Sequence, residues 1–332
     1  MVTQERDPDH SSSKPTELNE TAISSNETVT KMRKLIEART LKGFRDLLPA
    51  EAIAKGSMLQ ALRNVFDSYG YVPIETPHLE YTEVLVGDAG DDIQKQLYRF
   101  RDNGDRDVTL RFDLTVPFAR YSVQHASHLP LPFKRYAIGE VFRGEKSQHG
   151  RYREFTQCDF DFIGTTSIAS DAEIVLVIAA SMRAISVDSF TISINNRKVM
   201  NGLSNHLGAA DKAVDILRII DKISNIGTEG AKKELIAVGL PESSATTVLE
   251  FISLSNSYQS TALFEKLSPY ADQDETLAEG VKELKGLIGI LEQSGLDSSC
   301  YKIDLSTARG LGYYTGTVYE TLLDDLPQLG SV

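Results

Sequence analysis

The clearest structural signal in this 332-residue chain is the stretch FKRYAIGEVFRGEKSQHGRYREFTQCDFDFI, residues 133–163. Two strand-like runs, 133–145 and 151–163, flank a polar segment, 146–150, whose length is typical of a hairpin loop. Successive side chains of a strand point to opposite faces of the sheet. The stretch therefore predicts a long antiparallel hairpin with one apolar face and one polar face.

The two faces of this hairpin differ in kind. The apolar face carries Tyr136, Ile138, Phe142, Tyr152, Phe160 and Phe162. The polar face carries Arg143, Glu145, Arg151, Arg153, Gln157, Asp159 and Asp161. A face of mixed charge is costly to bury unless it meets water or a ligand, and arginine suits bidentate contact with carboxylate or phosphate. The pattern leaves two interpretations open, a ligand site or an exposed sheet face with ordinary surface ion pairs.

The rest of the sequence alternates between helix and strand signals. Helices are predicted at 49–69, at 113–121, at 171–185 behind a capping box of Ser170 and Glu173, and at 211–222, 231–238 and 276–293. Extended segments are predicted at 71–77, 97–100, 108–112, 190–194, 300–305 and 316–322. A sheet-rich part, a helical interruption and a return to strand predict an α+β fold, an antiparallel β-sheet flanked by helices with a helical insertion.

This order divides the chain into four parts. Residues 1–38 are expected to form a disordered tail, because the first 30 residues contain no aromatic side chain and are rich in polar groups. Residues 39–203 form the first part of the core domain and 204–297 the helical insertion. Residues 298–332 form the second part of the core.

Composition narrows the class of protein. The chain has 35 basic and 47 acidic residues, a net charge of −12, which excludes a generally basic nucleic-acid coat protein but not a local basic site. Its two cysteines and six histidines show no disulfide or metal-ligand spacing, so we expect a reducing compartment and no protein metal cluster. No apolar run reaches the roughly 18 residues that a membrane span needs, so no membrane is expected.

A second polar segment, TARGLGYYTG at residues 307–316, follows the strand predicted at 300–305. Glycine lets the backbone approach a ligand closely, Arg309 could stabilise charge on a phosphate, and Tyr313 and Tyr314 offer flat faces and hydroxyls. The alternative is a simple turn between strands. The segment is neither a Walker loop nor a GxGxxG motif.

Taken together, these motifs resemble the catalytic domain of histidyl-tRNA synthetase, a class II aminoacyl-tRNA synthetase. The matching pieces are Gly43-Phe44-Arg45-Asp46, Pro77 in the motif 1 region, Arg111-Phe112-Asp113-Leu114-Thr115, the motif 2 runs 142–145 and 150–157, and 309–316. They span about residues 40–325, and the last is specific to histidine-binding members. The resemblance implies a class II synthetase-like sheet.

The resemblance also implies an activity. Such enzymes activate L-histidine with ATP to histidyl-adenylate and transfer the histidyl group to tRNA(His). ATP is a substrate and is accompanied by Mg²⁺, and the family is a cytoplasmic homodimer that pairs through motif 1. Arg143 and Arg309 are the expected catalytic residues. The expected histidine-binding residues are Asp113, Leu114, Thr115, Arg143, Gln157, Asp161, Arg309, Tyr313 and Tyr314, and the expected ATP-binding residues are Arg143, Glu145 and Arg309.

Departures from the family pattern shape the alternatives. Gly312 stands where members often have Asp, and Lys146-Ser147 replace Arg-Pro in the motif 2 loop. The sequence ends before motif 3 and the anticodon-binding domain, so we expect an incomplete fragment that is weakly active or inactive. The alternative is the synthetase-like regulatory subunit of ATP phosphoribosyltransferase, which binds histidine without charging tRNA. The presence of the expected catalytic residues favours the enzyme.

Overall fold

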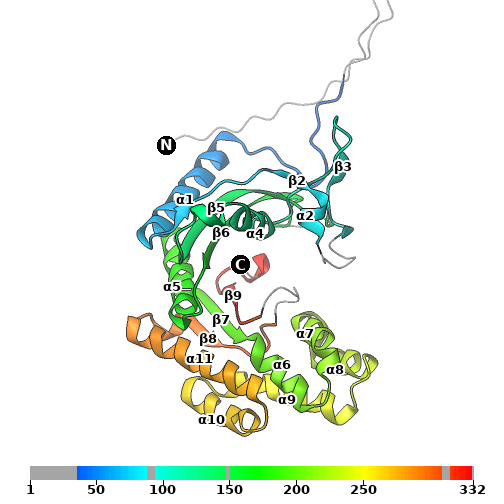
Figure 1. The fold of residues 1–332 in the computed structure, drawn as a ribbon, viewed down its shortest axis with the longest axis vertical. Helices are drawn as coiled ribbons and strands as arrows, with labels where there is room; N and C mark the ends of the chain where they lie inside the picture. Colours follow the sequence, from blue (N-terminus) through cyan, green and yellow to red (C-terminus); the bar gives the residue numbers. More distant parts are fainter. Residues whose placement is uncertain (1–35, 88–93, 147–149, 309–314, 331–332) are drawn as a thin grey trace, which may run out of the picture. The chain divides into compact units, whose positions relative to one another are not determined.

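The computed structural model describes residues 36–87, 94–146, 150–308 and 315–330. The chain divides into two compact units, 1–39 and 40–332, and the account below concerns the second (Figure 1). The predicted disordered tail lies, apart from its last three residues, outside the described residues.

Helices and strands alternate along the second unit. Its strands are β1 (Val72–Pro73), β2 (Leu79–Tyr81), β3 (Arg99–Arg101), β4 (Asp107–Leu110), β5 (Phe133–Phe142), β6 (Glu154–Ile163), β7 (Phe190–Asn196), β8 (Tyr301–Ile303) and β9 (Thr317–Leu323). Its helices are α1 (Pro49–Ser68), α2 (Thr82–Val86), α4 (Thr115–Gln124), α5 (Ile168–Ala184), α6 (Arg197–His206), α7 (Ala213–Asp221), α8 (Ile223–Ala237), α9 (Glu242–Ser257), α10 (Ser260–Ala271) and α11 (Glu275–Ser294).

The predicted hairpin is confirmed as the pair β5 and β6. The two strands run antiparallel in continuous register, from Phe133 opposite Ile163 to Phe142 opposite Glu154. They are shorter than predicted, but the Arg143 amide still donates to the Arg153 carbonyl at 2.8 Å just beyond the last pair. β1 adds to β5 in parallel and ends in Pro73, as a proline at a sheet edge should.

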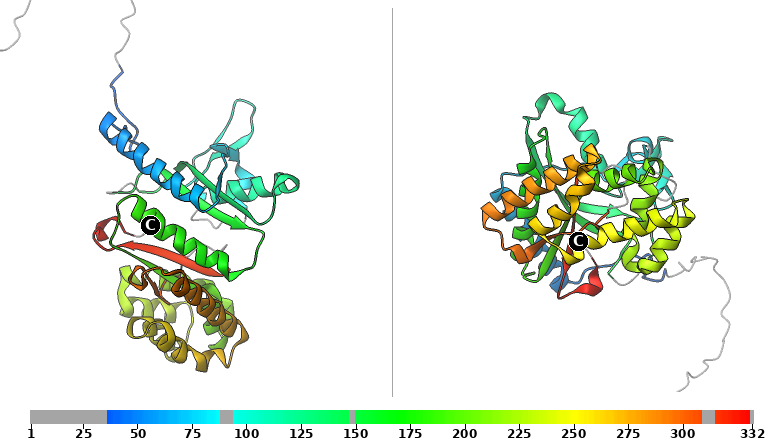
Figure 2. Two further views of the ribbon diagram at one scale, coloured as in Figure 1. Left: turned by 90° about the vertical axis from the view of Figure 1, so that its left-hand side faces the viewer. Right: turned by 90° about the horizontal axis from the view of Figure 1, so that it is seen from below.

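Helices α1 and α5 cover the apolar face of this hairpin. Phe66 of α1, Tyr136 of β5 and Val177 of α5 are buried together, and the Cys158 side chain packs against them on the apolar side, as its position predicts. Figure 2 shows the two helices, blue and green, lying side by side in the view turned from Figure 1. The opposite face holds only a small core of Leu114, Ala137 and Val141, so it remains available for polar groups.

The start of α5 differs from the prediction. The helix begins at Ile168, and the Ser167 hydroxyl caps it by accepting from the Ala169 amide at 3.3 Å. The predicted capping box of Ser170 and Glu173 is therefore wrong. An earlier serine already provides the cap, which frees the Glu173 carboxylate to pair with Lys134 at 2.6 Å.

A second three-stranded sheet, ordered β2-β4-β3, is joined to the hairpin by the segment that follows β4. The Arg111 amide donates to the His78 carbonyl at 2.9 Å, and the Phe142 amide donates to the Arg111 carbonyl at 2.9 Å. This segment then turns into α4. It therefore lies beside the end of β5, where the polar face of the hairpin begins.

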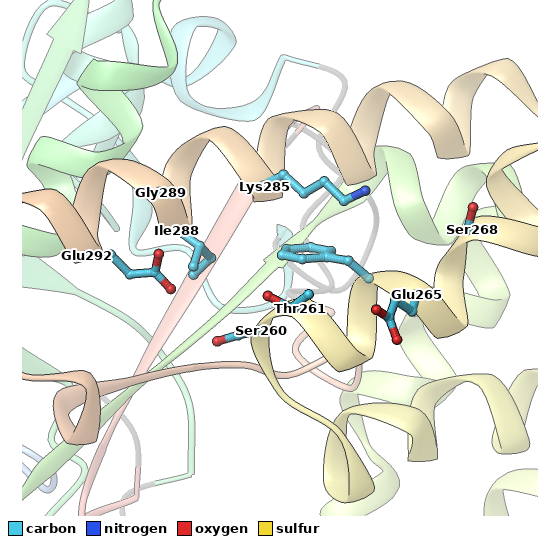
Figure 3. Close-up of a pocket in the computed structure, with 9 residues that line it drawn as sticks. Ser260, Thr261, Glu265, Ser268, Lys285, Ile288, Gly289 and Glu292 are labelled. Carbon is cyan, nitrogen blue, oxygen red and sulfur yellow. The ribbon is translucent and has the colours of Figure 1, made fainter.

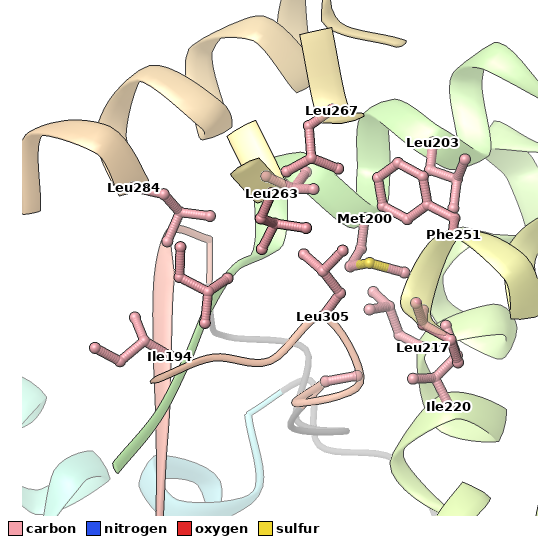
Figure 4. Packing of buried hydrophobic residues seen from close by; sticks show 14 of the residues in the cluster. Ile194, Met200, Leu203, Leu217, Ile220, Phe251, Leu263, Leu267, Leu284 and Leu305 are labelled. Atoms are coloured by element: carbon pink, nitrogen blue, oxygen red, sulfur yellow. The ribbon is translucent and has the colours of Figure 1, made fainter. Parts of the chain in front are cut away.

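A third sheet, ordered β8-β7-β9, supports the helical part of the chain. Helices α6 to α11 gather beyond this sheet (Figures 1 and 2), and their apolar side chains form one continuous core with β7 and β8. Figure 4 shows the centre of that core, where Leu284, Leu305 and Met200 lie among side chains from α7, α9 and α10. α6 crosses α11 closely, because a Cβ on Gly280 would lie 2.8 Å from the Val199 amide nitrogen. Within the described ranges, no helix combines the length and apolarity needed to cross a bilayer.

Candidate active site

The polar face of β5 and β6 is built by pairing small residues on one strand with functional residues on the other. Ala137 lies opposite Asp159, and Gly139 lies opposite Gln157. These short side chains leave room above β5 for the carboxyl and amide groups of β6. The space is shared with the segment 111–114, which approaches from the second sheet.

Arg111 occupies part of that room and ties the two sheets together. The residue is 4% exposed, and its guanidinium donates to the carbonyls of Glu140 and Thr76, both at 2.8 Å. A Cβ on Gly139 would lie 2.3 Å from its Nη2 atom. Glycine at this position is therefore a steric requirement of the arginine. Burial lowers the pKa of Arg111.

Arg143 lies just past the end of β5 and is held against the same segment. Its Nε donates to the Phe112 carbonyl at 2.9 Å, and its guanidinium carbon lies 5.1 Å from the centre of the Phe155 ring. The side chain is only partly buried. Arg143 is thus a fixed cation at the mouth of the polar face.

Three carboxyl groups share this face: Asp113, Asp159 and Asp161. Asp113 is 5% exposed, and its Oδ1 accepts from the Val116 amide at 3.1 Å, which caps the first turn of α4. Asp161 forms an ion pair with Arg135, whose side chain is fully buried on β5 directly opposite.

Burial raises the pKa values of these carboxyl groups, which favours their neutral forms. Burial, with the neighbouring Asp161 charge adding to it, raises the pKa of Asp159 to about 7. Burial also raises the pKa of Asp113 and of Asp161, while nearby arginines oppose the rise. Perturbed carboxyl groups gathered in a cleft are a mark of functional sites.

Several buried polar atoms here lack hydrogen-bond partners within the part of the chain that the structure describes. They are Nε and Nη1 of Arg135 and Oε1 of Gln157. Buried polar groups are almost always satisfied in folded proteins. Of these atoms, the Gln157 Oε1 acceptor belongs to a side chain that is only partly buried, and it suits a polar ligand such as an amino acid.

The structure brings five of the predicted residues together at this face. Asp113, Gln157 and Asp161 line it, Leu114 packs beneath it, and Arg143 stands at its edge. Thr115 is close by as the first residue of α4. Glu145 lies further out, where its contacts are to Arg151 and to the Arg153 guanidinium. Arg309, Tyr313 and Tyr314 lie outside the described residues.

Sequence reasoning missed two residues that build the site, Arg135 and Gly139. Both stand on the same side of β5 as Arg143, an even number of positions away, and the alternation could have placed them there. The importance of Arg135 lies in its register opposite Asp161, which the sequence alone leaves undetermined.

The residues on either side of 309–314 are held by the junction of β7 and α6. The Asn195 amide group donates to the carbonyls of Leu305 at 3.1 Å and Thr307 at 3.0 Å. The Arg197 amide donates to the Gly316 carbonyl at 2.8 Å. Asn195 is 1% exposed, so these bonds are protected from water.

A pocket of about 600 Å³ lies elsewhere, between α10 and α11 (Figure 3). Its wall includes the Lys285 ammonium, 5.4 Å from the centre of the Phe264 ring, and the carboxylates of Glu265 and Glu292. These side chains belong to the outer surface of two amphipathic helices and are not converging buried groups. We therefore place the active site on the hairpin. In the described ranges, no three His, Cys, Asp or Glu side chains are arranged to hold a metal ion.

Comparison with known proteins decides the family. The family model described as histidyl-tRNA synthetase matches residues 43–329. The chain belongs to the histidyl-tRNA synthetase family. It is 55% identical to a histidine–tRNA ligase of Wolinella succinogenes over 91% of this chain and 69% of the relative. It is 50% identical to a histidine–tRNA ligase of Helicobacter pylori strain J99, over 90% of this chain and 68% of the relative.

Solved structures agree with this assignment. A crystal structure of histidyl-tRNA synthetase from Nostoc sp. PCC 7120 superposes with a TM-score of 0.79 at 34% identity, over 90% of this chain and 68% of that one. A structure from Bacillus halodurans, titled as an ATP phosphoribosyltransferase regulatory subunit/histidyl-tRNA synthetase, has a TM-score of 0.76 at 24% identity and supports the fold alone. The predicted synthetase-like α+β fold of the histidyl-tRNA synthetase family is confirmed.

Proposed function

We propose that this chain is a histidine–tRNA ligase: it joins L-histidine to ATP as histidyl-adenylate and passes the histidyl group to tRNA(His). One structural observation carries the proposal. Three carboxyl groups gather on the open face of β5 and β6 with Arg143 at its edge, and the buried Oε1 of Gln157 has no partner among the described residues. This arrangement suits an amino acid, whose ammonium meets acids and whose carboxylate meets a guanidinium.

Histidine would lie along the polar face in this proposal. Asp113 and Thr115 would hold its ammonium, Gln157 and Asp161 its polar groups, and Arg143 its carboxylate. A carboxylate oxygen of histidine attacks the α-phosphorus of ATP, the bond from that phosphorus to the bridging oxygen breaks, and pyrophosphate leaves. In the second step a ribose hydroxyl of the tRNA attacks the acyl carbon, and AMP leaves.

Negative charge builds up on the α-phosphate during the first step. Arg143 stabilises this charge from one side of the cleft, and we assign Arg309 to the other. Glu145 and Arg143 would contact ATP. A guanidinium fixed before the reaction lowers the barrier because it binds the transition state more strongly than the ground state. Mg²⁺ would enter with ATP, held mainly by the phosphates, because Mg²⁺ is usually bound through substrate phosphates and one or two carboxylates.

The proposal includes a homodimer in the cytoplasm. α1 and the neighbouring strands expose large apolar side chains: Ile53, Met58, Val72, Leu79, Tyr81 and Phe100. Exposed apolar side chains of this size support a second copy of the chain as partner. Sedimentation equilibrium tests this, since a monomer has a mass of 36.7 kDa. Both cysteines are free thiols, which agrees with a reducing compartment.

Histidine-dependent exchange of pyrophosphate into ATP tests the first step. We expect exchange with L-histidine and none with other amino acids, and charging of tRNA(His) tests the second step. If the folded protein binds ATP but its pyrophosphate exchange does not depend on histidine, the assignment is rejected. No observation here favours the regulatory-subunit alternative over the ligase.

The role of Arg309 gives a sharper test. We expect Arg309→Ala to lower the exchange rate by about a hundredfold or more, the typical loss when one preorganised donor is removed. Melting temperature should stay close to that of the parent. Arg218→Ala, which removes an exposed arginine of α7, is the control and should leave exchange unchanged. Near-normal exchange in Arg309→Ala would rule out its assigned role.

A further inference from the structure

We propose that Arg135 is a positioning residue for histidine recognition: from its buried place on β5 it holds Asp161 in place and balances its negative charge, so that the Asp161 carboxylate can bind the substrate. The inference rests on the proposed function and deepens it. Arg135 is not among the residues that the family resemblance assigns to the site.

The surroundings of Arg135 leave its guanidinium little freedom. The side chain is 0% exposed and forms an ion pair with Asp161, its cross-strand partner. Its Nη2 donates to the Leu114 carbonyl at 3.2 Å. The guanidinium carbon lies 4.2 Å from the centre of the Phe118 ring on α4. Arg135 is thus held by β6, by the segment before α4 and by α4 itself.

A purely structural role accounts poorly for this residue. A buried ion pair is often no more stable than well-packed apolar side chains of similar volume. Arg135 also keeps Nε and Nη1 without hydrogen-bond partners among the described residues, which adds to the cost of burying it. Meanwhile its partner Asp161 is 27% exposed and reaches the open face. The pair therefore joins a buried cation to a carboxylate that a ligand can touch.

Charge balance explains what Arg135 does for Asp161. The other charges that interact with Asp161 are Asp159 on β6 and Asp113 before α4. Arg143 acts electrostatically on these two carboxyl groups, and Arg111 acts on Asp159. Burial raises the pKa of Asp161, and the Arg135 charge is what opposes that rise most directly. Without Arg135, the three neighbouring carboxyl groups would take up protons and lose their attraction for an ammonium.

The test compares binding of L-histidine and of MgATP by isothermal titration to the parent chain, Arg135→Met and Arg135→Lys. We expect Arg135→Met to weaken histidine binding by about thirtyfold or more, the range seen when one partner of a buried charge pair is lost. Binding of MgATP should change by less than about twofold. Arg135→Lys keeps the charge but loses the planar fork, so we expect only about a three- to tenfold loss.

A double variant shows whether Arg135 acts through Asp161. We expect Asp161→Asn combined with Arg135→Met to bind histidine about as weakly as the weaker single variant, because both remove the same interaction. In Arg135→Met, histidine binding should also require a higher pH than in the parent, because the carboxyl groups lose their counter-ion. Arg135→Lys should restore the parent pH profile.

Arg120→Met is the matched control. Arg120 is also partly buried, pairs with Glu80 at 2.5 Å and has a buried Nε without a partner among the described residues. We expect Arg120→Met to lower the melting temperature and leave histidine affinity unchanged.

Four results would overturn the inference. The first is an equal loss of affinity for histidine and for MgATP in Arg135→Met, and the second is a loss of histidine affinity in the double variant equal to the product of the two single losses. The third is an unchanged histidine affinity in Arg135→Lys, and the fourth is a parent chain that binds no histidine. The third result decides the matter even where Arg135→Met does not fold. A parent chain that binds histidine with the expected Arg135 dependence but shows no pyrophosphate exchange would reject the ligase function and leave this inference standing.

Discussion

Individual residues on the β5–β6 face combine two demands that normally conflict, burial and charge. Asp159 shows the conflict most clearly, because it stands opposite a small alanine, between Gln157 and Asp161 on the same face, and its pKa rises to about 7. At neutral pH this carboxyl group is therefore only partly ionised. A ligand ammonium would bind it most strongly in its charged form, so substrate binding and proton release are coupled.

Replacing Asp159 tests its raised pKa through stability. The folded protein keeps the Asp159 proton up to about pH 7, whereas an unfolded chain releases it near pH 4. The contribution of Asp159 to the free energy of unfolding therefore falls as pH rises from about 4 to about 7. We expect Asp159→Asn to be more stable than the parent at pH 8, by up to about 4 kcal/mol, with the difference vanishing near pH 4.

Urea denaturation between pH 4 and pH 8, without histidine, provides the measurement. Asp215→Asn, on the half-exposed side of α7, is the control and should follow the parent at every pH. Parallel curves for Asp159→Asn and the parent would show that the raised pKa is not a property of the folded state.

Residue-level patterns in the sequence predicted the polar face but not its internal pairing. Period-two alternation was enough to place Gln157 and Asp161 together, and the hairpin register confirms that they share a face. Alternation does not show how deeply a side chain is buried, however. Whether an arginine such as Arg135 is buried or exposed depends on α4 packing over it, a contact between segments far apart in the sequence.

Among the elements, the junction of β7 and α6 has the widest influence on the site. It starts α6 through the Asn196 cap and holds both flanks of the stretch that contains Arg309 through Asn195 and Arg197. The junction thus links the helical part of the chain to the proposed ATP side of the cleft. Local sequence patterns predicted β7 and α11 well, whereas the start of α5 was missed because two candidate serines lay three residues apart.

Asn195→Ala tests the importance of this junction. Removing the amide leaves two buried carbonyls without their donor, and we expect a loss of about 2–4 kcal/mol in the free energy of unfolding. At temperatures where the variant stays folded, histidine-dependent exchange should fall at least tenfold. Ser193→Ala is the matched control, because Ser193 is equally buried on β7 but its hydroxyl meets Asp304, at 3.5 Å. Equal exchange in the two variants would contradict a positioning role for Asn195.

The molecule as a whole separates its stability from its site. The large core binds α6 to α11 onto β7 and β8, while the hairpin relies on two much smaller clusters. The alternation of strand and helix signals predicted this α+β organisation. It could not predict which helices share a core, because the spacing of apolar residues records only that a helix has a buried face.

Hydrogen exchange should show this separation directly. We expect L-histidine to slow amide exchange in β5, β6 and the first turn of α4, because a bound ligand stabilises the segments that contact it. Exchange in α8, α9 and α10 should change little. Uniform protection across the chain would mean that the whole unit opens cooperatively, which would contradict this separation. L-alanine at the same concentration serves as the control.

The contact between Phe118 and the Arg135 guanidinium has a practical consequence. The chain contains no tryptophan at all, so its fluorescence comes from tyrosine alone. Phe118→Trp would place the single strong emitter of the protein against the Arg135 guanidinium. That guanidinium pairs with Asp161, one of the carboxyl groups proposed to bind the substrate. The occupancy of the amino-acid site could then be followed in real time as a change of emission, without labels and without turnover.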